Sequence, residues 1–385
     1  MSHYNKCEYI KENLLKKRIK SIVSFIIYRL CLLRRSERPA HDPPENSVAI
    51  VFLGALGDMV VLCGAAKKLK EAGKTLTLIC KTDNEIAQFA QISCLFDEII
   101  KLDIRGLKRF KHLSVLHHME FNTVFCAPPG RHILPDIYAC AIKAEHRYFA
   151  DTLQDCTSLR LKKASDKKAD KLVSINSTHE LDRYSEFVKA CGFTDEAVEP
   201  FILSRPAQQR NKILAIFPGA GGGAQKRWHA EKFADVAKAL TAEGLVSEVL
   251  ILGNEADLYY CNKLYELLFE NCNVRNLCAQ TTISKLCDIL SGCCLTLVND
   301  SGGAHISVAC KTPVIVISGM WQYGRFYPNL HCDGLVSVSD EQRFCQSCNS
   351  SRPLCCVSPA PCIENIDEAE ILKQARLLIG RIYND

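Results

Sequence analysis

Short apolar segments alternate with longer amphipathic segments along most of this 385-residue chain. Residues 48–53 (VAIVFL) form a continuous apolar run that ends in a glycine-containing turn, and a helical pattern then continues to residue 71. An apolar run without polar alternation is typical of a parallel strand that is buried on both faces. Strands that alternate with helices predict an α/β protein with a doubly wound parallel sheet.

The alternation occurs in both halves of the chain. In the first half we expect further strands at 75–80, 96–101 and 121–126, and helices at 85–92 and 133–144. In the second half we expect strands at 213–217, 248–252, 294–298 and 313–318, and helices at 230–243, 257–269, 283–290 and 302–310. A chain of this length usually needs more than one hydrophobic core. We therefore predict two Rossmann-like domains that face each other across a ligand-binding cleft.

The polar, proline-containing segment 204–211 (SRPAQQRN) predicts a linker between the two domains. Residues 46–203 then form the N-terminal domain, and residues 212–366 form the C-terminal domain. Residues 367–385 form a closing amphipathic helix, and residues 1–45 precede the first strand as a basic extension.

Residues 1–45 carry the net charge of the chain. They hold ten Lys or Arg and five Asp or Glu residues, and this excess equals the formal net charge of +5. The rest of the chain is formally neutral, which argues against a nucleic-acid-binding protein with a broad basic face. The apolar run 21–33 is shorter than the roughly 20 residues of a spanning helix. It predicts either a helix in the interface of an anionic membrane or an amphipathic helix packed on the first domain.

The chain contains 22 cysteines, many of them inside apolar runs. A secreted disulfide framework is usually short and rich in loops, so we predict reduced, buried thiols in a cytoplasmic protein. A cluster near the C-terminus is different, because Cys345 and Cys348 have the C-x-x-C spacing of a metal site. With Cys356 and Cys362 they form a candidate structural metal site; a disulfide formed on oxidation and ordinary thiols are the alternatives.

The segment 298–305 (VNDSGGAH) is a strand that ends in polar residues and two glycines before a helix begins. Backbone N–H groups and the positive end of a helix suit a phosphate, and glycines let a ligand approach the backbone. The alternative is a tight turn in which Asp300 or Ser301 caps the helix. The candidate ligand-binding residues of this segment are Asp300, Ser301, Gly302, Gly303 and His305.

A second strand–loop–helix junction, residues 218–228 (PGAGGGAQKRW), leads into two cations. Lys226 is a candidate partner for a diphosphate, and Arg227 is the rival for that role. The segment matches neither a Walker A loop nor a dinucleotide-binding fingerprint, which disfavours an ATPase and a dehydrogenase. Glu255 follows the strand at 248–252, where a carboxylate can bind a ribose; a solvated helix-start Glu is the alternative.

Asp58 follows Gly57 at the start of the first helix of the other domain. The positive helix end favours the ionised carboxylate, which can act as a general base if it faces the cleft. The alternative is a simple helix cap.

In this order, the motifs resemble glycosyltransferase family 9, the ADP-heptose:lipopolysaccharide heptosyltransferases. The resemblance covers residues 46–380. The matching segments are 54–58, 217–228 with 231–233, 252–255, 299–305 with 312–319, and residues 345–348 and 362–366 of the cysteine-containing tail. It implies a GT-B fold and inversion at the sugar without a catalytic metal or other cofactor. It also implies that Asp58 is the base, that Lys226 holds the diphosphate and that Glu255 holds the adenosine ribose. Gly64 and Gly303 stand where this family usually or often has proline, and Ala55-Leu56 offers no hydroxyl before Gly57.

The resemblance implies transfer of heptose from ADP-heptose to a lipid A-linked lipopolysaccharide core, by a cytoplasmic protein peripheral on the inner membrane. Another nucleotide-sugar donor, a protein acceptor or a non-catalytic nucleotide-binding scaffold are the alternatives. Arg131 and His132 are candidate acceptor contacts, because they follow a proline-glycine turn of the first domain, but they are equally typical of surface charges.

Overall fold

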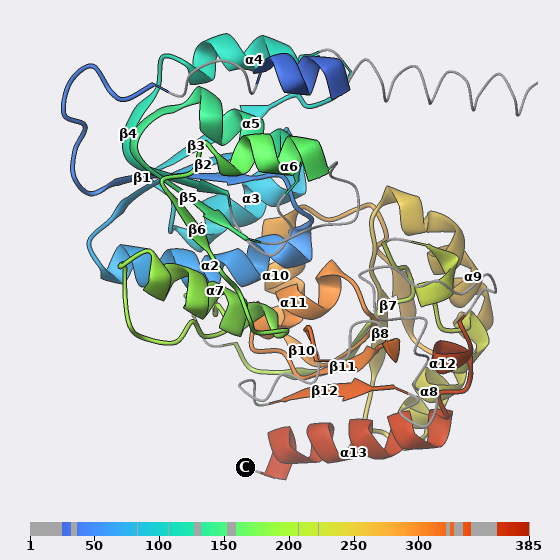
Figure 1. Cartoon of the computed structure of the whole chain (residues 1–385). Coiled ribbons are helices and arrows are strands. Elements are labelled where there is room, and N and C mark those ends of the chain that lie inside the picture. The colour runs from blue at the N-terminus through green and yellow to red at the C-terminus, as the bar shows by residue number, and fades with distance from the viewer. Residues whose placement is uncertain are drawn as a thin grey trace, which may run out of the picture.

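The computed structural model describes residues 25–31, 37–82, 84–106, 108–126, 132–151, 159–206, 208–221, 223–320, 324–326, 334–339 and 360–384. These residues form two six-stranded parallel sheets, each with helices packed against it (Figure 1). The doubly wound α/β architecture predicted from the alternating pattern is therefore confirmed.

The first sheet has the strand order β3-β2-β1-β4-β5-β6. Its central strand β1 (Ser47–Phe52) is buried at every position, as its uninterrupted apolar sequence requires. The other strands are β2 (Thr75–Lys81), β3 (Glu98–Leu102), β4 (Glu120–Cys126), β5 (Lys143–Ala150) and β6 (Lys171–Val173). The helices are α2 (Leu56–Glu71), α3 (Asn84–Ser93), α4 (Lys108–Leu116), α5 (Ile133–Ala141), α6 (Leu159–Asp166) and α7 (Glu180–Ala190).

The second sheet has the order β12-β11-β10-β7-β8-β9, and its central strand β10 (Cys293–Asn299) is entirely buried. The other strands are β7 (Asn211–Phe217), β8 (Glu248–Ile251), β9 (Val274–Asn276), β11 (Val314–Ile317) and β12 (Leu335–Val338). The α-helices are α8 (Ala230–Ala242), α9 (Leu258–Leu268), α10 (Ile283–Ser291), α11 (Gly302–Ala309), α12 (Pro361–Glu364) and α13 (Glu368–Asn384). Two short 3-10 turns are η1 (Ala224–Lys226) and η2 (Glu255–Asp257).

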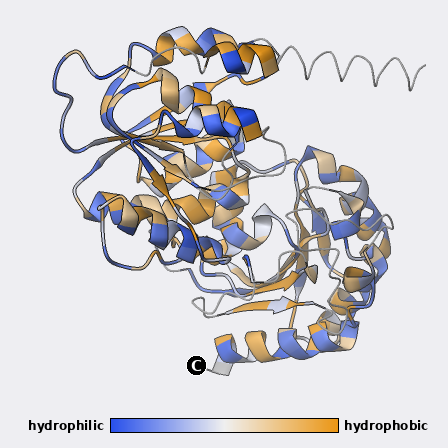
Figure 2. Ribbon diagram, viewed as in Figure 1, coloured by the Kyte–Doolittle hydropathy of each residue, from blue (hydrophilic) through white to orange (hydrophobic). Residues whose placement is uncertain are grey.

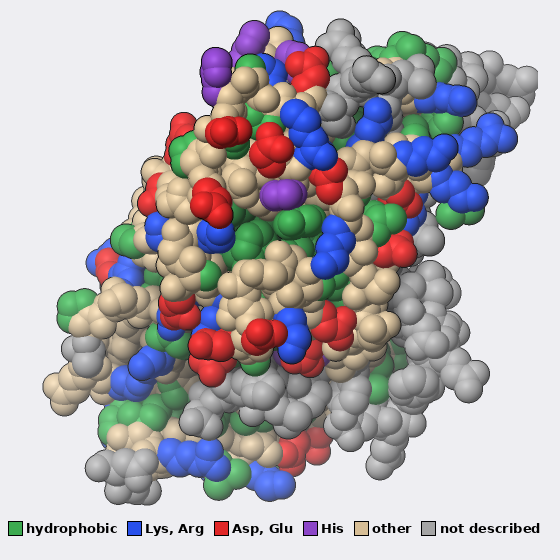
Figure 3. Space-filling model, turned by 60° about the vertical axis from the view of Figure 1, so that its left-hand side comes forward, with side chains coloured by type: hydrophobic (Ala, Val, Ile, Leu, Met, Phe, Trp, Pro, Cys, Tyr) green, Lys and Arg blue, Asp and Glu red, His purple; other side chains and the backbone are tan. Residues whose placement is uncertain are grey.

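The closing helix α13 packs on α8 and on strands β10 and β11 of the second sheet. Polar and apolar patches alternate along it, as expected of a helix with one buried face (Figure 2). On the face of the molecule shown in Figure 3, acidic and basic side chains of the described residues are interspersed. That mixture agrees with the neutral formal charge of the chain after residue 45.

One predicted boundary is wrong. The helix expected over residues 133–144 ends at Ala141, and strand β5 begins at Lys143. The sequence of β5 (KAEHRYFA) contains several charged residues and does not have the apolar pattern of a buried strand. Arg147 is nevertheless only 2% exposed. Its guanidinium donates to the carbonyl oxygens of Ile142 (2.6 Å) and Glu37 (2.8 Å), which compensates a burial that hydropathy does not predict.

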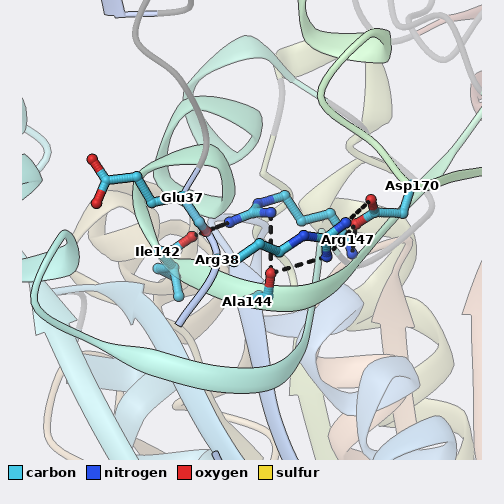
Figure 4. A network of polar contacts seen from close by, with 6 residues as sticks. All are labelled: Glu37, Arg38, Ile142, Ala144, Arg147 and Asp170. Atoms are coloured by element: carbon cyan, nitrogen blue, oxygen red, sulfur yellow. Dashed lines mark hydrogen bonds and ion pairs between the residues drawn. The ribbon is translucent and has the colours of Figure 1, made fainter. Parts of the chain in front are cut away.

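The same arginine fixes the N-terminal extension to the first domain (Figure 4). Arg38, one residue after Glu37, donates to Asp170 at 2.8 Å, and Asp170 also accepts from the backbone N–H of Arg147. The extension is thus bound to the sheet at residues 37 and 38 rather than being tethered only at the start of β1.

A short helix at residues 25–31 packs on the outer side of the first domain. The ring of Tyr28 lies 5.8 Å from that of Phe110 on α4, and its hydroxyl accepts a hydrogen bond from Arg109 at 2.8 Å. Packing on the first domain was one of the two expectations for this segment. Ile26 and Leu30 on the same helix remain 52% and 58% exposed. Among the described residues, no helix has the length and apolar character that a membrane crossing requires.

No disulfide joins the described cysteines to one another, and most of them are buried, as predicted. Cys362 on α12 is 5% exposed and belongs to the hydrophobic core of the second domain. Cys345, Cys348 and Cys356, the other residues of the candidate metal site, lie outside the described residues. Within the described ranges, no group of three or more His, Cys, Asp or Glu side chains is placed to hold a metal ion.

Candidate functional site

A cavity of about 690 Å³ lies between the two domains and is lined by both of them. The first domain contributes residues from the turn after β1 and the start of α3, and the second contributes the turns after β7, β8 and β10. In parallel sheets of this type, ligands bind beyond the carboxyl ends of the strands. The predicted residues Glu255, Ser301, Gly302 and Gly303 line this cavity, and Ala55, Leu56 and Gly57 face them.

The turn after β10 presents the N-terminus of α11 to the cavity. Ser301 occupies the N-cap position with an extended backbone, but its side chain makes no capping hydrogen bond within the described structure. The carboxylate of Asp300 is paired with Lys226. The alternative expectation, a turn whose polar side chain caps the helix, is therefore not what the structure contains. The first N–H groups of α11 remain suited to an anionic ligand.

Lys226 lies at the end of the glycine-rich loop that follows β7. Its Nζ is 2.9 Å from Oδ2 of Asp300, and the two side chains are only 14% and 7% exposed. Gly223 begins the turn that carries Lys226, with a φ of 132° that side chains other than glycine rarely adopt. The loop thus brings its ammonium group directly to the turn after β10, so the two motifs separated by 74 residues meet.

Arg227, the rival cation, has different partners. Its guanidinium lies 4.2 Å from the ring centroid of Tyr260 on α9 and donates to the Tyr260 hydroxyl at 3.0 Å. It also donates to the carbonyl oxygen of Ala220 at 3.3 Å. Arg227 therefore ties the glycine-rich loop to α9, whereas Lys226 reaches the turn before α11.

Asn299 at the end of β10 is a residue that the sequence reasoning did not assign to the site. It is fully buried, donates to the carbonyl oxygen of Pro218 at 2.8 Å and accepts from the backbone N–H of Trp228 at 3.0 Å. It therefore holds both ends of the glycine-rich loop. In the sequence, this role could have been suggested only by the position of an amide side chain directly after five apolar or small residues of a buried strand.

Asp58 is half-buried in the first turn of α2. Its Oδ2 accepts a hydrogen bond from the backbone N–H of Ala55 at 3.1 Å, so the helix-cap alternative is part of the structure. Asp58 does not itself line the cavity, whereas the three residues before it do. Its position next to Gly57 places it opposite α11 of the other domain.

His305 on α11 is half-buried against the first domain. A Cβ atom on Gly57 would lie 2.7 Å from the Cδ2 of His305, so only glycine permits this approach of α2 and α11. Removal from water lowers the pKa of His305, and the carboxylates of Asp300 and Asp58 oppose that effect. The imidazole is thus held closer to its neutral form than in water.

Two further carboxylates line the cavity and were not predicted. Asp257, two residues after Glu255, accepts from the backbone N–H of Asn254 at 3.3 Å. Glu85 comes from the start of α3 in the first domain. Their signal in the sequence was only an acidic residue in the first turn of a helix, which is common at helix starts.

Of the two acceptor candidates, the structure describes His132. His132 immediately precedes α5 beyond the end of β4, is exposed, and is not one of the residues that line the cavity. Arg131 lies outside the described residues.

Comparison with known proteins identifies relatives for both the sequence and the fold. Residues 157–353 match the glycosyltransferase family 9 (heptosyltransferase) profile. The chain is 32% identical over 186 residues to lipooligosaccharide heptosyltransferase 2 of Campylobacter jejuni, an alignment that covers 47% of this chain and 56% of that protein. It is 28% identical over 109 residues to lipopolysaccharide heptosyltransferase 2 of Escherichia coli, covering 28% and 31%. The chain thus spans about half the length of the Campylobacter relative and less of the other.

Among solved structures, the Escherichia coli ADP-heptose lipopolysaccharide heptosyltransferase II superposes with a TM-score of 0.67 and 14% identity, covering 87% of this chain and 99% of that one. A glycosyltransferase family 9 structure from Veillonella parvula gives a TM-score of 0.67 and 17% identity, covering 87% and 97%.

Two parallel-sheet domains that face each other across a shared cavity are the architecture of the GT-B fold. This chain therefore has the GT-B fold. The sequence match extends over half of the chain and includes the glycine-rich loop, Glu255 and the β10–α11 turn. The chain belongs to glycosyltransferase family 9.

Proposed function

We propose that the protein is an inverting glycosyltransferase that moves heptose from ADP-heptose to a lipid A-linked lipopolysaccharide core. The observation that carries this proposal is the pairing of Lys226 with Asp300 directly before α11, whose first residues line a cavity that the start of α2 lines from the other domain. The donor and acceptor follow from the names of the Campylobacter and Escherichia coli relatives.

In this proposal Asp58 accepts the proton of the acceptor hydroxyl. The resulting oxygen nucleophile attacks the anomeric carbon of heptose from the face opposite the diphosphate, so configuration is inverted as the bond to ADP breaks. The electron pair leaves with the diphosphate oxygen. Lys226 and the N–H groups at the start of α11 stabilise that developing charge. Glu255 binds the adenosine ribose, and no metal or other cofactor takes part in a step.

Substitution of Asp58 and Lys226 tests the site. Asp58→Asn removes the base, and we expect a fall in kcat of at least about 100-fold, since general base catalysis contributes factors of that order. Lys226→Ala removes the ammonium group that is proposed to bind the diphosphate, and we expect ADP binding to weaken by about tenfold or more. Lys263→Ala, which removes a surface lysine paired with Glu231, is the control. Transfer at the parent rate by Asp58→Asn would show that the assigned base is wrong.

The nature of the donor needs a separate measurement. ADP, UDP and GDP sugars are compared by thermal shift, and ADP-heptose is then tested by mass spectrometry with a panel of truncated lipid A cores. Stabilisation by UDP alone contradicts the ADP assignment. Nucleotide binding with neither transfer nor donor hydrolysis favours the non-catalytic scaffold.

We also propose that the protein acts at the cytoplasmic face of the inner membrane and binds its surface through residues 1–45. A lipid-linked acceptor requires such a location. Support comes from the basic excess of this segment and from the exposed Ile26 and Leu30, which lie beside Arg29 on the helix at residues 25–31. Exposed apolar side chains next to cations are suited to an anionic lipid surface.

A further inference from the structure

One contact between the domains lies outside the large cavity and involves Glu180, the first residue of α7 in the first domain. Its side chain is only 1% exposed. Oε1 accepts a hydrogen bond from Nε of Arg325 at 2.6 Å, and the backbone N–H of Glu180 donates to the carbonyl oxygen of Arg325 at 2.9 Å. Arg325 belongs to the second domain, on the turn at residues 324–326 between β11 and β12. One residue of each domain is therefore bound to the other through both side chain and backbone.

The burial of Glu180 makes this contact sensitive to the separation of the domains. Burial raises the pKa of Glu180, whereas Arg325 and Arg183 oppose the increase. Arg183 lies on the same helix, with its Nε 3.6 Å from Oε2 of Glu180. A buried carboxylate is stable when its charge is matched by a hydrogen-bonded partner. Arg325 supplies that partner only while the two domains are together.

The contact is connected to the candidate site through aromatic packing. The Arg325 guanidinium lies 4.7 Å from the ring centroid of Phe326. Phe326 packs edge-on against His305 with centroids 5.1 Å apart, and His305 rests on Gly57, the neighbour of Asp58. Side chains of Glu180, His305 and Phe326 also line a small cavity of about 30 Å³ between the domains.

We propose that Glu180 and Arg325 form a closing contact that sets the position of Asp58 relative to the donor site on α11. Both are positioning residues, since neither lines the large cavity. The inference rests on the proposed sugar transfer, in which a base from one domain acts on a donor held by the other. Without the contact, the domains spend less time in the arrangement that places Asp58 opposite α11, and transfer slows in proportion.

The test compares Arg325→Ala, Arg325→Lys, Glu180→Gln and the double variant Glu180→Gln/Arg325→Ala with the parent protein. Arg376→Ala is the matched control, because Arg376 pairs with Glu243 and both belong to the second domain. Thermal unfolding first establishes that each variant is folded. Initial rates give kcat and KM, and calorimetry gives the Kd of ADP. Small-angle scattering with and without ADP gives the radius of gyration.

We expect Arg325→Ala to lower kcat by about tenfold, the size of one lost charged hydrogen bond. The Kd of ADP should stay within about threefold of the parent value, because most residues that line the cavity belong to the second domain. The double variant should lose no more than the worse single variant, since the two residues act through one contact. Arg325→Lys should recover part of the rate, and Arg376→Ala should match the parent.

Scattering separates a failure of this inference from a failure of the proposed function. The inference expects a larger radius of gyration for Arg325→Ala than for the parent with ADP bound. Equal radii together with parent-like kcat would overturn it, as would losses of kcat that add in the double variant. If the parent protein transfers no sugar, the proposed function fails, and the radii alone decide whether the closing contact exists.

Discussion

At the scale of single residues, two glycines lie where neighbouring atoms restrict the space for a side chain. A Cβ atom on Gly64 would lie 2.4 Å from the carbonyl oxygen of Glu199, and a Cβ on Gly303 would lie 3.0 Å from the ring of Phe217. The contact at Gly64 is with a backbone carbonyl group, which has little freedom to move. A side chain at position 303 requires the ring of Phe217 to give by only a few tenths of an ångström, so the restriction is stronger at Gly64.

Gly64→Ala tests this close approach. We expect it to lower the free energy of unfolding by about 1–3 kcal/mol, because the added methyl group forces α2 away from the segment at residue 199. Urea denaturation measures the change. Gly221→Ala is the control, since no described atom lies within 4 Å of its added Cβ. Equal stabilities of the two variants would contradict the packing argument.

His305 predicts a dependence of stability on pH. Because its pKa is lowered in the folded state, the unfolded chain binds more protons between that lowered pKa and the ordinary value of 6.5. The stabilisation is fully present above pH 6.5 and is lost as the pH falls below it. Glu180, whose pKa is raised, acts in the opposite direction, so the comparison is made between variants.

The measurement is the free energy of unfolding at pH 7.5 and at pH 5.5. The parent should lose more stability than His305→Asn over this interval. His118→Asn, which changes an exposed histidine, should behave as the parent does. The same loss in His305→Asn and in the parent would assign the pH effect to other groups.

At the scale of elements, the site is made where the turns after β7 and β10 meet. Asn299 joins them, because its amide satisfies Pro218 and Trp228 at the two ends of the glycine-rich loop. Lys226 makes a second connection by pairing with Asp300. The position of the ammonium group therefore depends on β10 as much as on its own loop.

Asn299→Ala should affect both stability and ligand binding. It leaves a buried N–H and a buried carbonyl without this partner, which costs about 1–3 kcal/mol. It also frees the loop, so we expect weaker ADP binding by calorimetry. Asn262→Ala, which changes an exposed asparagine of α9, provides the control. Unchanged ADP affinity in a destabilised Asn299→Ala protein would limit the role of Asn299 to folding.

At the scale of the whole molecule, the charge distribution separates the N-terminal extension from the neutral remainder. The extension is attached by Arg147 to Glu37 and by Arg38 to Asp170. A membrane surface that binds the helix at residues 25–31 would therefore also orient the first domain, which carries Asp58.

Vesicle binding tests this arrangement. The parent protein should sediment with vesicles of anionic phospholipid, and less with neutral vesicles or in high salt, because cations attract anionic lipid within the Debye length. Ile26→Asp/Leu30→Asp should reduce sedimentation by placing charge on the exposed apolar positions. Val115→Asp on α4, equally 52% exposed, tests whether the surface extends beyond the helix. Equal binding of all proteins to neutral and anionic vesicles would contradict the proposal.

The amino-acid sequence by itself determined the alternation of strands and helices, the two-domain organisation and the family. These follow from local patterns, since a strand such as β1 is apolar at every position and a glycine-rich turn has few alternatives. It also predicted Glu255 and the turn at 301–303 as site residues, and these line the cavity because residues at the ends of parallel strands lie at the same edge of the sheet.

Only the tertiary structure shows the partners of the two neighbouring cations, the amide that holds the loop and the places where the domains touch. Lys226 and Arg227 are neighbours in sequence, and only their partners, Asp300 and Tyr260, distinguish them. The strand β5 was not predicted for the same reason, since the burial of Arg147 depends on carbonyl groups of other segments. Contacts between residues that are distant along the chain leave no periodic pattern in the sequence, so the fold must form before they can be identified.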